Sequence, residues 1–185
     1  MRFNLRRVPR SVRRNETLAE MVAEYTAKLQ NKDYRRGTCY HESGHALFGE
    51  KYGSGRALFE APLAFTYDKF EGSFMFDEAR VYLNVPRYWR DDAKQMLAGK
   101  VVERTFTPKA HWADEEFYAD DFHYVYAALK KGRVPKSKWP SLIKRLESEI
   151  RRDLRNPSFR RAIERRAKTY ERALDKAIAK LGKAA

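Results

Sequence analysis

Apolar residues recur about every 3.6 positions over several long segments of this chain. Such spacing places them along one face of an α-helix, with polar and charged residues on the other face. The segments with this pattern are residues 16–30, 38–52, 86–104 and 113–131. Gly53 and Gly55 follow the second segment and Gly132 follows the fourth, where glycine commonly ends a helix. The pattern predicts a mainly helical fold.

Two other segments have the composition of β-strands. Residues 57–67 and 72–84 are rich in Phe, Tyr, Val and Leu with some alternation, and a polar stretch ending in Gly72 lies between them. This arrangement predicts a small β-hairpin or an edge pair of strands. Together with the helices, it indicates an α+β fold.

The carboxy-terminal segment predicts two further helices. The first begins at Trp139 and Pro140, and Asn156 followed by Pro157 starts the second. The apolar residues of the second helix alternate spacings of four and three, as in a coiled-coil seam. We therefore expect an antiparallel helical hairpin here, or a surface for a partner. The residues of the seam are Ile163, Ala167, Tyr170, Leu174, Ala177 and Leu181.

The candidate chemistry is concentrated in one helical segment, which contains the sequence His41-Glu42-Ser43-Gly44-His45. Positions i and i+4 lie on one face of a helix, so His41 and His45 can bind the same metal ion. Glu42 then lies beside the metal, where a carboxylate can take a proton from a water molecule. The motif predicts a zinc site with Glu42 as the catalytic base.

The third metal ligand does not follow from this motif. Cys39 is the single cysteine of the chain, so cysteine-rich structural zinc sites are excluded. Cys39 is two residues from His41, which turns it away from the metal face, and we expect it to be a small buried residue. The third ligand is then a carboxylate or one of the two remaining histidines, His111 and His123.

Residues 39–49, CYHESGHALFG, resemble the metal-binding helix of the FtsH-type peptidase domain, the protease half of membrane AAA+ metalloproteases. Two later segments resemble that family in the same order: Leu97 to Arg104 is similar to its GGRAAEE-like segment, and Ala119 to Phe122 to its Asn-Asp-Leu segment. The likeness covers roughly residues 34–131. It implies a zincin-like fold, a zinc ion and peptidase activity.

The resemblance also implies the third ligand, which is Asp121, 76 residues after His45. Glu103 and Asp120 are the alternative carboxylates. The chain departs from the family pattern at Val101 and Val102, which replace alanines and predict looser or rearranged packing beneath the site. No GxxxxGK[ST] phosphate loop occurs in the sequence, so we expect activity without ATP.

Charge divides the chain into three parts. The net charge is +14, but residues 39–139 carry 15 basic and 15 acidic side chains, so the excess lies in the two flanks. We interpret residues 1–14 as a basic segment, residues 15–139 as the peptidase-like domain, and residues 140–185 as a basic helical pair that packs on or extends it. No stretch is apolar enough to predict a transmembrane helix, and a cytoplasmic location is the simplest interpretation.

The sequence therefore predicts a zinc metalloendopeptidase that hydrolyses flexible or unfolded polypeptides. The alternative is a protease-derived binding module whose basic ends dock an acidic protein or nucleic acid. The large aromatic residues of the segment 113–131 are assigned mainly to the core, although one tyrosine could line the cleft. The oligomeric state and the substrate are not predicted.

Overall fold

The computed structural model describes residues 23, 27–61, 64–68, 73–77, 80–108 and 118–184, and these residues are mainly helical, as predicted. None of the helices in this part of the chain is long and apolar enough to cross a bilayer. The basic segment 1–14 and most of the helix predicted at 16–30 lie outside the described residues. The helices are α2 (Lys32–Lys51), α3 (Trp89–Phe106), α4 (Ala119–Lys131), α5 (Trp139–Asp153) and α6 (Pro157–Ala184), with a short 3₁₀ helix, η2 (Lys136–Lys138), before α5.

The helix that carries the two histidines of the motif, α2, is longer than the sequence pattern predicts. It begins six residues before the expected start because Asn31 caps it, accepting hydrogen bonds through Oδ1 from the backbone N–H groups of Asp33 (2.9 Å) and Tyr34 (3.2 Å). The first turns are polar, so an apolar stripe does not reveal them. The end is as predicted: Gly53 and Gly55 follow the helix with φ of +81° and +80°, which favours glycine.

Local residues explain the starts of α5 and α6, whereas α3 and α4 begin without a side-chain cap. The third helix, α3, begins at Trp89 rather than at residue 86, and the predicted start of α4 at residue 113 lies outside the described residues. Pro140 lies in the first turn of α5. Asn156 precedes α6, and its Oδ1 accepts from the N–H of Ser158 at 2.9 Å. These ends follow from capping and proline chemistry.

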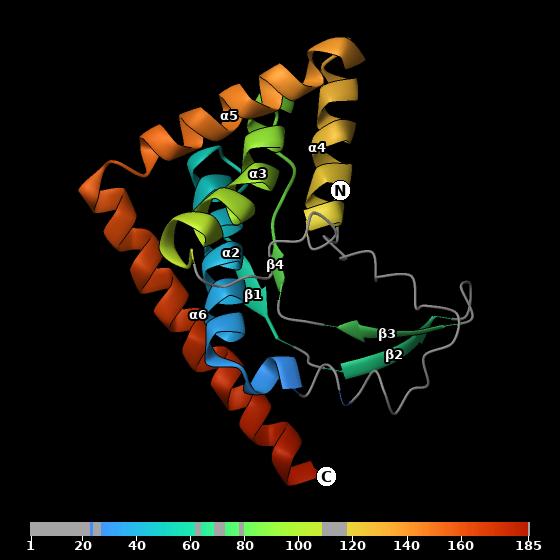
Figure 1. Cartoon of the computed structure of the whole chain (residues 1–185), viewed down its shortest axis with the longest axis vertical. Coiled ribbons are helices and arrows are strands. Elements are labelled where there is room, and N and C mark those ends of the chain that lie inside the picture. Colours follow the sequence, from blue (N-terminus) through green and yellow to red (C-terminus); the bar gives the residue numbers. More distant parts are fainter. Residues whose placement is uncertain are drawn as a thin grey trace.

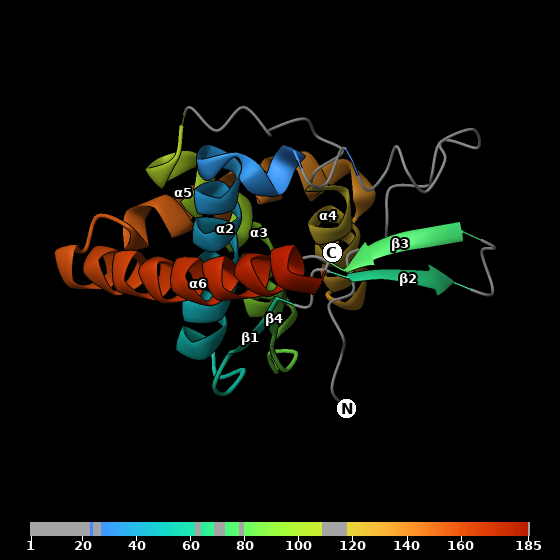
Figure 2. The ribbon, with the colours of Figure 1, turned by 90° about the horizontal axis from the view of Figure 1, so that it is seen from below.

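Within the residues that the structure describes, four short strands pair antiparallel in two sets. They are β1 (Leu58–Glu60) with β4 (Arg80–Tyr82), and β2 (Ala64–Asp68) with β3 (Ser73–Asp77). The register places Phe59 opposite Val81 and Thr66 opposite Met75. The β2–β3 pair extends away from the helices, whereas β1 and β4 lie beside α2 (Figures 1 and 2).

Two buried apolar clusters lie on different sides of α2. The larger joins α2, α3, α4, α5 and the beginning of α6, and the smaller joins α2 to β4 and the middle of α6. Val101 and Val102 are 2% and 0% exposed within the larger cluster. The helix α3 thus directs both valines into the main core, and the looser or rearranged packing expected beneath the site stays a prediction. Cys39 is fully buried in the smaller cluster, as predicted.

The predicted antiparallel hairpin of the last two helices is wrong. From the turn at residues 154–156, α5 and α6 diverge, and α6 runs along α2 instead (Figure 1). The seam residues Tyr170 and Leu174 belong to the smaller cluster, and the Tyr170 ring stacks on Phe59 of β1 at 4.0 Å. The apolar stripe packs there because α2 and β1 supply the apolar surface that it needs. A bidentate ion pair at 3.0 Å between Arg166 of α6 and Glu50 of α2 holds the two helices together.

Candidate metal centre

The two histidines of the HExxH motif lie side by side on α2. His41 and His45 are one turn apart and are 1% and 4% exposed. Their rings meet edge to face with centroids 4.6 Å apart, and their Nε2 atoms are 2.9 Å apart. The predicted placement on one helix face is therefore confirmed, and both Nε2 atoms point toward one place.

A hydrogen bond at the opposite nitrogen orients each imidazole. Nδ1 of His41 lies 3.0 Å from Oε2 of Glu103, and Nδ1 of His45 lies 2.8 Å from the backbone oxygen of Gln95. A carboxylate and a carbonyl can only accept, so in a neutral imidazole the hydrogen is on Nδ1 and Nε2 is left as a bare lone pair. This is the arrangement that supports histidine as a metal ligand.

The carboxylate of Asp121, in the first turn of α4, completes the group. Its Oδ2 lies 3.1 Å from His41 Nε2 and its Oδ1 lies 3.3 Å from His45 Nε2. Oδ2 is buried and makes no hydrogen bond of standard geometry. With both Nδ1 atoms donating elsewhere, lone pairs of all three side chains face one another. Such a group is stable only with a positive charge among them, which a proton or a metal ion can supply.

The spacing of these three atoms fits a metal ion. A tetrahedral ion with bonds of about 2.0–2.1 Å separates its ligand atoms by roughly 3.3 Å. The observed separations of 2.9, 3.1 and 3.3 Å are within a few tenths of this value. Imidazole and carboxylate donors suit zinc and other first-row divalent metals. Among the described residues, His41, His45 and Asp121 form the group that could hold a metal ion.

The charged side chains in and beside the ligand group shift the pKa values of one another. Burial alone lowers the pKa of His41, but the carboxylates of Asp121 and Glu103 outweigh it and raise the pKa to about 10. Burial raises the pKa of Asp121, but His45 and His41 hold it well below its usual range. The buried carboxylate of Glu103 and the partly buried carboxylate of Asp121 thus create a negative potential at the imidazole nitrogens, and the same potential favours a divalent cation.

Two glycines allow α2 and α3 to come close enough to build this group. A Cβ atom on Gly99 would lie 2.4 Å from His45 Nε2 and 2.7 Å from His41 Nε2, and a Cβ on Gly44 would lie 2.6 Å from the backbone oxygen of Ala98. No side chain fits at either place. In the sequence, Gly99 stands out only as part of the segment that resembles the GGRAAEE-like pattern, because its contact with both imidazoles depends on the crossing of two helices.

Glu42 lies outside the ligand group and contacts β4. It is 4% exposed, and its Oε2 accepts a hydrogen bond from the backbone N–H of Val81 at 2.9 Å. Since β4 lies along α2, this bond holds the carboxylate at the edge of the strand. Sequence reasoning did not predict this contact.

An aromatic ring covers one side of the group. Tyr118, which immediately precedes α4, is 1% exposed, and its ring is nearly parallel to that of His41 at 5.8 Å. The ring thus packs directly against the two-histidine group, and the expectation that one tyrosine lines a cleft stays a prediction. By contrast, Tyr126 is 42% exposed and does not belong to the core.

The structure distinguishes among the candidates for the third metal ligand. Glu103 supports His41 through Nδ1 and does not reach the ligand group, and His123 is exposed on α4. The side chain of Asp120 and the whole of His111 lie outside the described residues. Of the alternatives that the structure describes, Asp121 is the one that meets both imidazoles.

Comparison of the chain with protein-family models, with curated proteins and with solved structures finds no match.

Proposed function

We propose that the chain is a zinc-dependent metallopeptidase, similar to the FtsH-type peptidase domain, that hydrolyses flexible or unfolded polypeptides without ATP. The observation that carries this proposal is the convergence of His41, His45 and Asp121 within 3.3 Å of one another in a buried site. Catalytic zinc sites use three protein ligands and keep a fourth position open, whereas structural sites use four.

Each side chain of the site has its own role in the proposed reaction. A bound zinc ion supplies Lewis acidity, which polarises a carbonyl and brings the pKa of water toward about 7. Glu42 is the general base: it takes a proton from the attacking water and gives it to the leaving amine. The Val81 N–H holds the Glu42 carboxylate in a fixed position. Glu103 and the Gln95 carbonyl keep the Nε2 atoms of the histidines directed at the ion.

The proposal is tested by measuring zinc content and activity on the same samples. We expect the purified full chain to hold one zinc per molecule and to cleave unfolded casein, with activity lost in a chelator and restored by zinc. Glu42→Gln should keep zinc and lose at least about 100-fold in turnover, since general-base catalysis contributes this much. Glu60→Gln, at an exposed position of β1, is the matched control. Undiminished cleavage by Glu42→Gln would exclude the proposed mechanism.

The second candidate is a metal-stabilised binding module, and one contact favours it. A module without activity has a use for Glu42, because its bond to Val81 fastens β4 to α2. The exposed basic residues of α6 would then contact an acidic protein or nucleic acid; they include Arg161, Arg165, Lys168 and Arg172. In this case chelation should lower the melting temperature, and no cleavage of casein should occur with zinc bound. The cytoplasmic location and the acidic or nucleic-acid partner stay predictions.

A further inference from the structure

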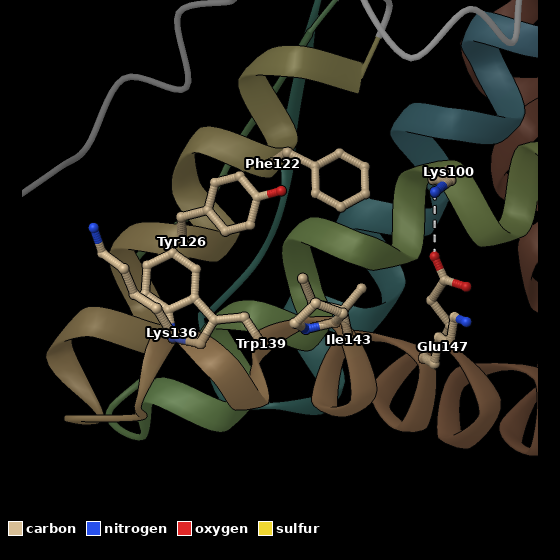
Figure 3. A pocket seen from close by; sticks show the side chains of 9 residues that line it. Lys100, Phe122, Tyr126, Lys136, Trp139, Ile143 and Glu147 are labelled. Atoms are coloured by element: carbon tan, nitrogen blue, oxygen red, sulfur yellow. Dashed lines mark hydrogen bonds and ion pairs between the residues drawn. The ribbon is translucent and has the colours of Figure 1, made fainter.

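A cavity of about 430 Å³ lies between α3, α4, η2 and α5, beside the metal centre but lined by different residues (Figure 3). Lys100 and Phe122 are in its lining, and they directly follow Gly99 and Asp121 in the sequence. A step of one residue turns a side chain by about 100° around a helix. The helices α3 and α4 therefore present one face to the metal centre and a neighbouring face to the cavity.

Aromatic rings form one wall of the cavity. Tyr126 stacks on Trp139 with centroids 5.2 Å apart and an angle of 15°, and Phe122 lies 5.9 Å from Tyr126. The indole N–H of Trp139 donates to the backbone oxygen of Val134 at 2.9 Å, which fixes the ring. Tyr126 is 42% exposed. The wall is thus preformed and open to a ligand that has an apolar or aromatic part.

The charged residues of the lining are mostly positive. Lys100 binds Glu147 at 3.3 Å and lies 4.7 Å above the ring of Phe122. Lys136 and Lys144 also line the cavity, and both are exposed. Neither makes an ion pair with any residue that the structure describes, and Glu147, the carboxylate of the lining, is already bound to Lys100 and to Arg151. Within the described part of the chain, two ammonium groups therefore stand beside an aromatic wall without a counter-charge.

We propose that this cavity binds a polypeptide segment in which an aromatic side chain is flanked by carboxylates. The ring would lie against Tyr126 and Phe122, and the carboxylates would pair with Lys136 and Lys144. Choosing a polypeptide as the ligand rests on the proposed peptidase function. The cavity then holds substrates at a second place beside the metal centre and selects acidic, aromatic segments.

Binding can be measured independently of cleavage. The probe is a dye-labelled peptide with a central Glu-Phe-Glu sequence, titrated by fluorescence anisotropy with the full-length Glu42→Gln protein in the presence of zinc. A Gln-Phe-Gln peptide and a Glu-Ala-Glu peptide test the charge and the ring separately. Two exposed ion pairs are together worth about tenfold in Kd, so we expect about tenfold weaker binding of the Gln-Phe-Gln peptide.

A matched pair of double variants tests whether the peptide binds in the cavity. Lys136→Ala with Lys144→Ala should weaken binding of the Glu-Phe-Glu peptide about tenfold, on the same argument. Lys130→Ala with Lys168→Ala removes the same charge from exposed positions outside the cavity and should change Kd less than twofold. Tyr126→Ala should weaken the Glu-Phe-Glu peptide but not the Glu-Ala-Glu peptide.

Three results would overturn the assignment: equal binding of all three peptides, equal loss in the two double variants, or displacement of the peptide by AMP at lower concentration than by unlabelled peptide. The last result would identify a nucleotide site instead. Specific binding by a protein that never cleaves casein would refute the proposed activity and leave the cavity assignment standing. Cleavage of casein without cavity-dependent peptide binding would refute the cavity assignment and leave the proposed activity standing.

Discussion

The Oε2 atom of Glu103 lies 3.0 Å from Nδ1 of His41, and both side chains are almost completely buried. The two residues are 62 positions apart in the sequence and come from α3 and α2. The carboxylate fixes the tautomer of His41 and turns Nε2 toward His45 and Asp121. Glu103 was one of the alternatives for the third ligand, and the structure gives it this supporting position instead.

Glu103→Gln should weaken zinc binding while leaving the fold intact. Residues that support a metal ligand typically contribute 10- to 100-fold in affinity, and the amide keeps part of the hydrogen bond, so we expect a loss of about tenfold. Competition with a fluorescent zinc chelator measures it. Glu60→Gln should leave the affinity unchanged. If Glu103→Gln binds zinc as tightly as the natural chain, Glu103 does not orient His41.

Gly99→Ala should remove the metal site. The new methyl group would lie 2.4 Å from His45 Nε2, so either the ring or α3 has to move. We expect a loss of about 2–3 kcal/mol in the free energy of unfolding, as for other overpacked sites, together with loss of bound zinc. Gly53→Ala is the control, because it meets no atom within 4 Å but has a φ of +81°. It should cost about 1 kcal/mol through backbone strain and keep zinc. Denaturant unfolding and metal analysis of both variants distinguish the two effects.

Arg166→Met should destabilise the packing of α6 on α2. Arg166 donates to both carboxylate oxygens of Glu50 at 3.0 Å, and both side chains are more than two-thirds buried. A bidentate, partly buried pair of this kind is worth about 1 kcal/mol after solvent screening. Arg165→Met changes the adjacent exposed residue and should alter stability by less than about 0.5 kcal/mol. Equal effects of the two substitutions in urea unfolding would show that the ion pair contributes nothing.

Asp92 should make stability depend on pH in the weakly acidic range. Burial raises the pKa of this carboxyl from 3.8 to about 6, against the opposing effect of Lys131. The folded state therefore holds the proton more tightly than the unfolded state. The contribution of Asp92 to stability is therefore greatest below about pH 4 and is lost as the pH rises through about 6.

Asp92→Asn should accordingly raise the free energy of unfolding at pH 7 by about 1 kcal/mol once partial exposure is allowed for, and change it little at pH 4. Urea unfolding at the two pH values measures the difference. Asp91→Asn, in the same first turn of α3, controls for the loss of a negative charge at the helix amino terminus. An equal gain in the free energy of unfolding at both pH values would show that the raised pKa of Asp92 is not its cause.

Local chemistry made several features predictable from the sequence. The placement of His41 and His45 on one face follows from helix geometry. The carboxy-terminal end of α2 follows from the glycines after it, and the start of α6 follows from the Asn156 cap. The burial of Cys39 follows from the apolar character of a free cysteine, and its position two residues before His41 turns it away from the metal face. Asp121 was reached through a resemblance between motifs, because 76 residues of chain separate it from His45 and no local rule spans that distance.

The remaining features depend on how the helices pack, and no periodicity in the chain specifies them. The crossing of α2 and α3 at Gly44 and Gly99 brings Glu103 and the Gln95 carbonyl to the imidazoles. The apolar stripe of α6 was visible in the sequence, but its partner was not, because any apolar surface of suitable shape can bury such a stripe. A sequence specifies which side chains an element offers on each face. Only the packed structure decides which face meets which, since that choice depends on contacts among distant segments.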